Sequence, residues 1–327
     1  MTQEVCVLTE PEEELRDKLE QRLGPVHTLL RLGMERIYED RFNHGINFFH
    51  PDKWYSLHSL FTCALKLTGL HYLGSRNAER IRVRHNRIYH SGLPDAFEGF
   101  TILQISDLHV DMNPAAMRRV SELVSTLDYD LCVLTGDFRG KAFGPFDQAL
   151  RGMTALCSQL AEPFYGVLGN HDTVRMLPGL EALGIRMLMN ESDTIMRGRH
   201  RIHLAGVDDA HYYSAANLEK AASRIPRGEF AVLLSHTPEI YKQAAFAGFQ
   251  LFLSGHTHGG QICLPGGIPV TLSSSKLPRR LGAGPWRYET MVGYTSAGLG
   301  ASVVPVRFNC EPEITLHYLH CTESGIG

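Results

Sequence analysis

Five short clusters of metal-ligand residues occur along the chain, and each follows an apolar run. In order they are Asp107-Leu108-His109, Gly136-Asp137, Gly169-Asn170-His171-Asp172, Ser235-His236 and Gly255-His256-Thr257-His258. Their carboxylate, amide and imidazole ligands suit Mn, Fe or Zn, and they lack the Cys that structural zinc sites usually contain. Together they supply enough ligands for two neighbouring ions, which activate water in phosphoryl transfer. The residues therefore predict a catalytic dinuclear site that hydrolyses a phosphoester.

The spacing within the clusters supports this interpretation. Asp107 and His109 are two residues apart, as are His256 and His258, so each pair points to one side of an extended segment. Asp137 offers two carboxylate oxygens that could bridge two ions. Any one cluster alone is more often a turn with a solvated polar residue. The occurrence of all five after apolar runs favours the metal site.

The apolar runs predict strands that are buried on both faces. They span residues 100–106, 130–135, 164–168, 230–234 and 249–253. Because open α/β folds place their sites at the carboxyl ends of strands, the five clusters should meet in one crevice. Helices are expected at 114–127, 144–160, 215–224 and 238–247. Before them, 10–42 and 53–70 read as amphipathic helices, and Ile81 and Val83 begin a period near two.

The order D-x-H, G-D, G-N-H-[DE], H, G-H-x-H resembles the calcineurin-like metallophosphoesterase superfamily. The segments 235–239, 255–262, 305–308 and 312–314 are similar to a bacterial branch that contains cell-wall phosphodiesterases and a UDP-2,3-diacylglucosamine pyrophosphatase. The resemblance covers about residues 81–320, and its motifs are specific. It implies an α/β fold, a four-layer sandwich of two mixed β-sheets flanked by helices, at 81–327. Residues 1–80 would form a helical N-terminal extension outside that core.

The resemblance also implies a role for each matching residue. The first metal would be bound by Asp107, His109 and His258, the second by Asn170, His236 and His256, with Asp137 bridging them. His171 would protonate the leaving oxygen or stabilise transition-state charge, and Asp172 would help to orient its ring. Many members place an Asp three residues after the G-D motif, where this chain has Phe138-Arg139-Gly140. Arg139 could instead face the substrate phosphate.

A long loop rich in Gly, Pro and Ser follows the last cluster at residues 264–287. It contains Lys276, Arg279 and Arg280, which are candidate substrate-binding residues because long loops beside a site are often functional. A solvated surface loop explains the same composition equally well. Both readings stay open.

Composition argues against nucleic-acid binding and favours a cytoplasmic location. The chain has 327 residues, a formal net charge of -3 and no long basic tract, so nucleic acid is not an expected partner. Its 7 Cys form no C-x-x-C pair, which favours reduced thiols and the cytoplasm. Neither a secretory signal nor an apolar run of about 18 residues is visible.

The N-terminal part carries apolar residues followed by basic ones. Trp54, Leu57, Leu60 and Phe61 precede Lys66, Arg76, Arg80, Arg82, Arg84 and Arg87. This combination would suit peripheral contact with an anionic membrane. Core packing of the apolar stripe, with Arg82 and Arg84 on the wet face of a strand, is the competing interpretation.

The expected function is that of a dinuclear metal-dependent phosphoesterase that hydrolyses a phosphodiester or a pyrophosphate. Two divalent ions are expected, with Mn preferred and Fe or Zn as alternatives. The most specific substrate candidate is a lipid-linked nucleotide such as UDP-2,3-diacylglucosamine. The alternative is a non-catalytic scaffold of the same fold that binds a protein partner. Such a scaffold would be expected to lose ligands that this chain retains.

Overall fold

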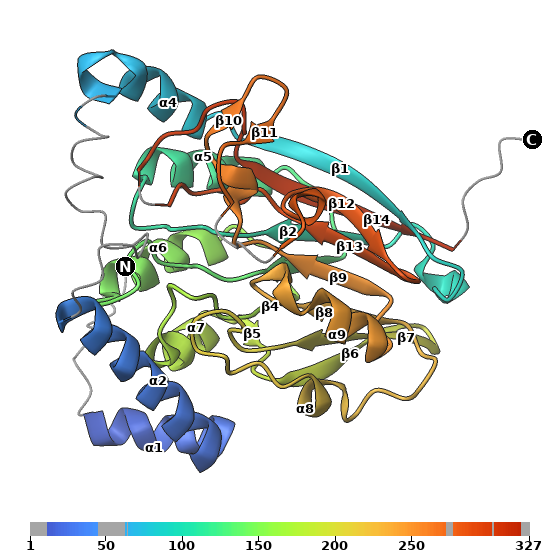
Figure 1. Ribbon diagram of the computed structural model, residues 1–327. Helices are drawn as coiled ribbons and strands as arrows, with labels where there is room; N and C mark the ends of the chain where they lie inside the picture. Colours follow the sequence, from blue (N-terminus) through green and yellow to red (C-terminus); the bar gives the residue numbers. More distant parts are fainter. Residues whose placement is uncertain (1–11, 45–62, 64, 273–276, 303, 322–327) are drawn as a thin grey trace, which may run out of the picture.

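Two large mixed β-sheets form the centre of the computed structural model, which describes residues 12–44, 63, 65–272, 277–302 and 304–321 (Figure 1). The first sheet has the order β1-β14-β2-β3-β4-β5, with β1 Arg82–Tyr89, β14 Glu313–His320, β2 Thr101–Ile105, β3 Leu131–Leu134, β4 Phe164–Gly166 and β5 Arg186–Met187. The second has the order β12-β13-β9-β8-β7-β6, with β12 Gly284–Tyr288, β13 Met291–Thr295, β9 Leu251–Ser254, β8 Ala231–Leu234, β7 His200–Gly206 and β6 Glu191–Arg197. A small hairpin of β10 Cys263–Leu264 and β11 Ile268–Pro269 lies outside both. The strands predicted before the five clusters correspond to β2, β3, β4, β8 and β9.

The side chains of the central strands alternate between two apolar cores. In β3, Leu131 and Val133 point between the two sheets, whereas Cys132 and Leu134 point to the outer face of the first sheet. The same alternation occurs in β8, where Leu233 faces outward. Because both faces of these strands are buried, continuous apolar runs are the appropriate sequence for them.

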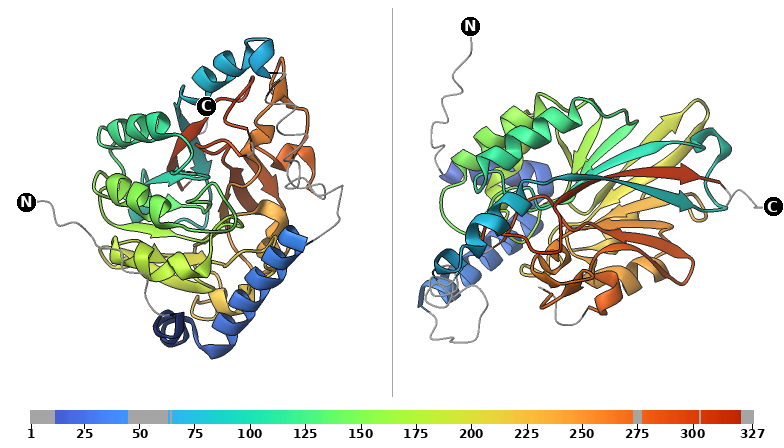
Figure 2. Two further views of the ribbon diagram at one scale, coloured as in Figure 1. Left: turned by 90° about the vertical axis from the view of Figure 1, so that its left-hand side faces the viewer. Right: turned by 90° about the horizontal axis from the view of Figure 1, so that it is seen from above.

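Helices cover the outer face of each sheet (Figure 2). The first sheet is covered by α5 Pro114–Val124, α6 Asp147–Cys157 and α7 Leu177–Ala182, and the second by α8 Leu218–Ala222 and α9 Tyr241–Phe246. The start of α5 has a local cause: Pro114 occupies its first turn, and the Asn113 side chain accepts hydrogen bonds from the N–H groups of Ala115 and Ala116. The predicted four-layer sandwich is confirmed.

Among the described residues, the helices α1 Glu12–Leu23, α2 Pro25–His44 and α4 Leu70–Ala78 precede the sheets. Gly24, with φ of 88°, separates α1 from α2. Leu19 and Leu23 of α1 are buried in the same apolar cluster as Leu103 of β2, so this part of the extension packs on the core rather than standing apart from it. The division of the chain at residue 80 stays a prediction. Most of the helix predicted at 53–70 lies outside the described residues.

The contacts of α4 are with the C-terminal part of the chain. The Asn77 side chain donates to the carbonyl of Arg307 (3.0 Å), and Gly74 lies against Val306 and Phe308. Among the helices that the structure describes, none is both long enough and apolar enough to cross a membrane.

Candidate metal centre

The five predicted clusters meet at one end of the two packed sheets, where the carboxyl ends of their strands lie. Asp107 follows β2, Asp137 follows β3 and Asn170 follows β4 in the first sheet, whereas His236 follows β8 and His256 follows β9 in the second. These residues are all buried. Both sheets therefore contribute predicted ligands to one site, and the packing of the sheets brings together residues that are far apart in the sequence.

The first group of side chains consists of Asp107, His109 and His258, whose ligand atoms lie within 4.8 Å of one another. The Nε2 atoms of His109 and His258 are 3.3 Å apart, and Nε2 of His258 is 3.4 Å from Oδ1 of Asp107. Burial lowers the pKa of His109 to about 4 and that of His258 well below its usual value, so both rings are neutral. Nδ1 of His109 donates to the carbonyl of Arg139 (2.8 Å), so Nε2 is the nitrogen left to bind a metal ion.

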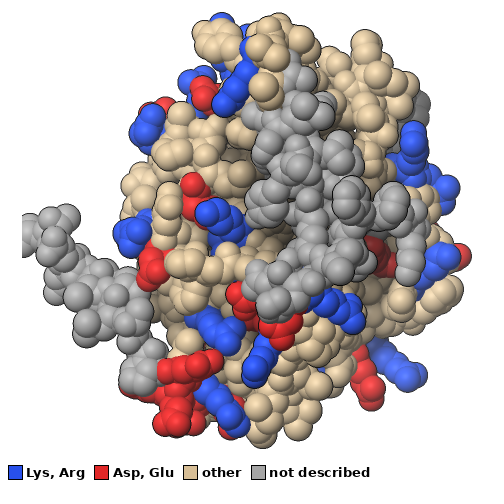
Figure 3. All heavy atoms as spheres, turned by 60° about the vertical axis from the view of Figure 1, so that its left-hand side comes forward, with Lys and Arg blue, Asp and Glu red and all other residues tan. Residues whose placement is uncertain are grey.

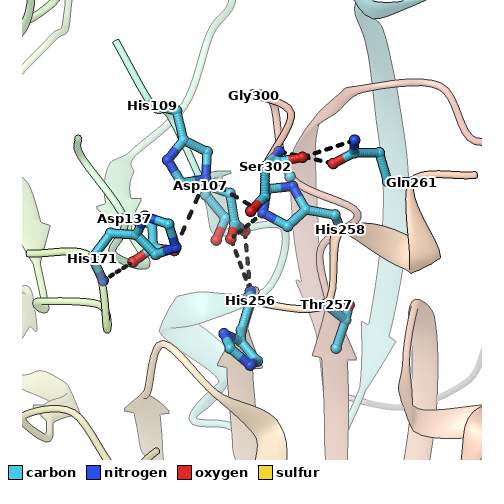
Figure 4. Close-up of polar contacts among 12 residues, drawn as sticks. Asp107, His109, Asp137, His171, His256, Thr257, His258, Gln261, Gly300 and Ser302 are labelled. Atoms are coloured by element: carbon cyan, nitrogen blue, oxygen red, sulfur yellow. Dashed lines mark hydrogen bonds and ion pairs between the residues drawn. The ribbon is translucent and has the colours of Figure 1, made fainter. Parts of the chain in front are cut away.

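Asp137 adjoins several imidazoles of the site, and Figure 4 shows it beside His171 and near His109. Its Oδ2 atom is 3.2 Å from Nε2 of His236, 3.9 Å from Nε2 of His109 and 4.0 Å from Nε2 of His171. Burial alone would raise the pKa of Asp137, but the surrounding imidazoles outweigh it and hold this pKa well below its usual value. The carboxylate is thus ionised and adjoins residues from both sheets, as a bridging ligand must.

The second group contains Asn170, His236 and His256. The Asn170 Oδ1 atom is buried, and it has no hydrogen-bond partner among the described residues. Nδ1 of His236 is 2.7 Å from the carbonyl of Thr135, so the Nε2 side of the ring faces the centre, and the rings of His236 and His256 are 5.2 Å apart. An unsatisfied buried oxygen suits a cation ligand, because leaving it unpaired costs about 1–3 kcal/mol.

The backbone at the site is held in an uncommon conformation. Positive φ angles occur at Asp107 (52°), His109 (42°), Asp137 (57°), His256 (73°) and His258 (50°). A non-glycine residue with positive φ is uncommon, and such residues cluster at functional sites. Neighbouring glycines permit the close packing: a Cβ at Gly169 would collide with the Asp137 carboxylate, and one at Gly255 with Ser106 and Asp107.

His171 lies at the edge of the centre, with 18% of its side chain exposed. Its backbone N–H donates to Oδ1 of Asp137 (2.9 Å), and its Nδ1 is 2.7 Å from the carbonyl of Gly140. The ring is therefore oriented by Gly140 and not by Asp172, in contrast to the sequence-based expectation. The Asp172 carboxylate instead accepts the backbone N–H groups of Asp137 (2.8 Å) and Gly169 (2.8 Å).

Three of the predicted substrate-binding residues, Arg139, Arg279 and Arg280, lie in the part of the chain that the structure describes. Arg139 is buried, and its guanidinium donates to the carbonyls of His171, Ala142 and Gly144, so it holds the loop after β3 rather than pointing to a substrate. Arg279 and Arg280 are exposed on the short helix η6 Arg279–Leu281. Lys276 lies outside the described residues.

The structure places residues at the site that sequence reasoning missed. The ring of His211 is 4.6 Å from that of His256, and Glu239 holds its Nδ1 at 3.0 Å. The signal for His211 was present, since polar residues follow the buried strand β7 as they follow the other ligand strands. Arg307 is fully buried beside His258 and donates to the carbonyls of Ala297 and Gly298 (2.8 and 3.0 Å).

Comparisons with known proteins agree with this geometry. Residues 100–260 match the family model described as calcineurin-like phosphoesterase. The chain is 28% identical over 258 residues to the uncharacterized metallophosphoesterase YkoQ of Bacillus subtilis (strain 168), covering 76% of this chain and 94% of YkoQ. It is 29% identical over 252 residues to YkuE, an uncharacterized metallophosphoesterase of the same organism, covering 74% and 86%. It is also 29% identical over 232 residues to the phosphodiesterase YaeI of Escherichia coli (strain K12), covering 66% and 81%.

Proposed function

Because the chain belongs to the calcineurin-like metallophosphoesterase superfamily, we propose that it hydrolyses phosphodiesters at a dinuclear metal centre. The observation that carries the proposal is the position of Asp137. Its ionised carboxylate lies between Nε2 of His109 and Nε2 of His236, which come from different sheets. We assign Asp107, His109 and His258 to one ion, Asn170, His236 and His256 to the other, and Asp137 to both.

The side chains support a simple division of labour. When bound, two divalent ions supply activation of water and neutralisation of phosphate charge. Asp137 and the buried imidazoles would hold these ions. His171 presents Nε2 on the Asp137 side, because its Nδ1 is occupied by the carbonyl of Gly140. We propose that this nitrogen donates a proton or hydrogen bond to the leaving oxygen.

The alternative is a scaffold that keeps the fold without catalysis. The chain retains every ligand of the superfamily pattern as well as His171, and nothing in that set favours loss of activity. An assay with bis(p-nitrophenyl) phosphate and Mn²⁺, Fe²⁺ or Zn²⁺ separates the two functions. We expect turnover with at least one ion, no turnover in Asp137→Asn, and wild-type turnover in Asp128→Asn, a substitution at an exposed carboxylate. A wild-type protein that binds metal yet is inactive with all three ions would support the scaffold.

The metal and the substrate can be proposed more narrowly. We propose Mn²⁺ as the preferred ion, with Fe and Zn as alternatives, because the ligands mix carboxylate, amide and imidazole groups. A pyrophosphate bond in a lipid-linked nucleotide such as UDP-2,3-diacylglucosamine is the most specific substrate candidate. A direct comparison of this nucleotide with a phosphodiester that lacks acyl chains tests it, and equal or greater kcat/KM for the simpler ester would exclude the narrower proposal.

We further propose that the enzyme acts in the cytoplasm, peripherally at a membrane surface. The cysteines that the structure describes are free thiols, as a reducing compartment requires. Apolar side chains are exposed on and just before the N-terminal helices, including Val26 (69%) and Leu30 (63%) on α2 and Leu67 (83%) before α4. Sedimentation with anionic vesicles tests this proposal. Wild-type protein should bind and Leu30→Glu/Leu67→Glu should bind less, whereas equal binding would contradict it.

A further inference from the structure

We propose that Arg31 of α2 is a positioning residue for the metal centre, although it lies far outside residues 100–260 that match the family. The inference rests on the proposed function, because it assigns α2 a part in holding the same centre. Arg31 does not contact the predicted ligands. It acts through the backbone and through the loops that carry them.

Arg31 is fully buried and makes a separate contact with each part of its guanidinium group. Nε donates to Oδ1 of Asp208 (3.2 Å), Nη1 to Oε1 of Glu35 (2.9 Å) and Nη2 to the carbonyl of Asp172 (3.0 Å). The guanidinium carbon lies 3.5 Å from the centre of the Tyr213 ring. Burial disfavours the charge, but the carboxylates of Asp208 and Glu35 outweigh it and raise the pKa of Arg31.

Through Asp172, Arg31 is connected to the predicted ligands that follow the strands of the first sheet. While Arg31 holds the Asp172 carbonyl, the Asp172 carboxylate holds the N–H groups of Asp137 and Gly169. Glu35, one helical turn after Arg31, accepts from the Thr173 hydroxyl (2.5 Å) and from the Val174 N–H (2.7 Å). The segment that begins with Asn170 and His171 is therefore fixed by α2 immediately after its functional residues.

Through Asp208 and Tyr213, Arg31 is connected to the second sheet. These residues lie in the loop after β7, and the same loop carries His211, whose ring is 4.6 Å from that of His256. Tyr38 of α2 stacks on Tyr212 of this loop, with ring centres 5.6 Å apart. One face of α2 thus contacts loops from both sheets beside the centre, and Arg31 contacts both of these loops.

The chemistry of the contacts requires arginine. Its planar fork presents several N–H donors in fixed directions, whereas a lysine ammonium is a single point. Arg31→Lys keeps the positive charge between Asp208 and Glu35 but cannot also reach the Asp172 carbonyl and cover Tyr213. Substitution of residues that orient metal ligands typically costs about 10–100-fold in metal affinity or activity.

The test compares Arg31→Lys with Arg22→Lys. Arg22 is the matched control, because its contacts in the described part of the chain are with Glu181 (2.8 Å), Glu191 (2.7 Å) and the carbonyl of Met187 (2.9 Å), outside the segments that carry the predicted metal ligands. Calorimetric titration of metal-free protein with Mn²⁺ should show one weakened ion in Arg31→Lys, by about 10–100-fold. It should show wild-type affinities in Arg22→Lys. Thermal unfolding verifies that each variant is folded. If Arg31→Lys does not fold, Glu35→Gln is tested in its place.

A double substitution distinguishes positioning from general destabilisation. If Arg31 acts through His171, the loss of kcat caused by Arg31→Lys should shrink in a His171→Ala background, because residues that act together are not additive. Wild-type Mn²⁺ affinity and kcat in folded Arg31→Lys would overturn the proposal, as would equal losses in Arg22→Lys. A wild-type protein that binds two ions but hydrolyses no phosphodiester would reject the proposed function alone, since the Mn²⁺ titration would still decide the role of Arg31.

Discussion

Asn170 is the residue that best separates a metal centre from a core that merely contains buried histidines. A buried imidazole nitrogen can be satisfied by a nearby carbonyl, as Nδ1 of His236 is by that of Thr135. The Asn170 Oδ1 atom has no such partner in the described part of the chain, although it is buried. Native proteins rarely leave a buried acceptor unpaired, so a bound cation would account for the unpaired Asn170 oxygen.

His171 gives the sharpest prediction at the scale of single residues. In His171→Ala we expect kcat to fall by about 10²–10⁴-fold, the usual contribution of general acid catalysis, while both ions stay bound. The fall should be smaller for aryl leaving groups, because they need no proton. Steady-state kinetics and elemental analysis of the purified variant measure the two quantities. Loss of an ion would show that His171 is a ligand and not an acid.

At the scale of elements, the site was predictable where its signal was local. Each ligand cluster directly follows an apolar strand, so the sequence alone indicated β2, β3, β4, β8 and β9 and the edge where they meet. The contacts of Arg31 and Arg139 were not predictable, because their partners depend on how loops from different strands pack together. Motif position suggested that Arg139 faces substrate, but the loop carbonyls around it require a donor. The parallel pairing of β1 with β14 was not predictable either, because it joins strands that are far apart in the sequence.

From the surroundings of His317 in β14 we predict how the free energy of unfolding depends on pH. Its Nε2 donates to Oε1 of Gln104 (2.9 Å), its Nδ1 accepts from Asn86 (3.0 Å), and burial lowers its pKa to about 3. The unfolded chain binds a proton at this residue below about pH 6.5, whereas the folded chain does not. Stability should therefore fall as pH decreases from about 6.5 toward 3, and His317 alone accounts for about 2 kcal/mol of the loss at pH 5.

Urea unfolding of the metal-free protein at pH 7.5 and pH 5 measures this effect. The decrease in unfolding free energy between the two pH values should be about 2 kcal/mol smaller in His317→Gln than in the wild type. His85→Gln, at an exposed position of β1, should leave the decrease unchanged. An identical decrease in His317→Gln and wild type would show that His317 is not held neutral in the folded state.

At the scale of the whole molecule, the N-terminal helices join the two sheets on the side where the metal ligands lie. This arrangement accounts for an extension whose apolar residues are partly buried in the core and partly exposed. The surface charge gives little support to a purely electrostatic membrane contact. Arg82 is paired with Glu311 (2.8 Å) and Arg84 with Glu313 (3.4 Å). Figure 3 shows acidic and basic side chains interspersed among the described residues in its view of the molecule.

The central claim is that Asp137 joins two ions in one centre, and electron paramagnetic resonance of the Mn²⁺-loaded protein tests it most directly. Two ions that share the Asp137 carboxylate should be about 3.5–4 Å apart and therefore magnetically coupled. We expect two Mn²⁺ per chain and the multiline spectrum of a coupled pair in the wild type, and loss of that coupling in Asp137→Asn. A single bound Mn²⁺, or two with the six-line spectrum of isolated ions, would contradict the dinuclear centre.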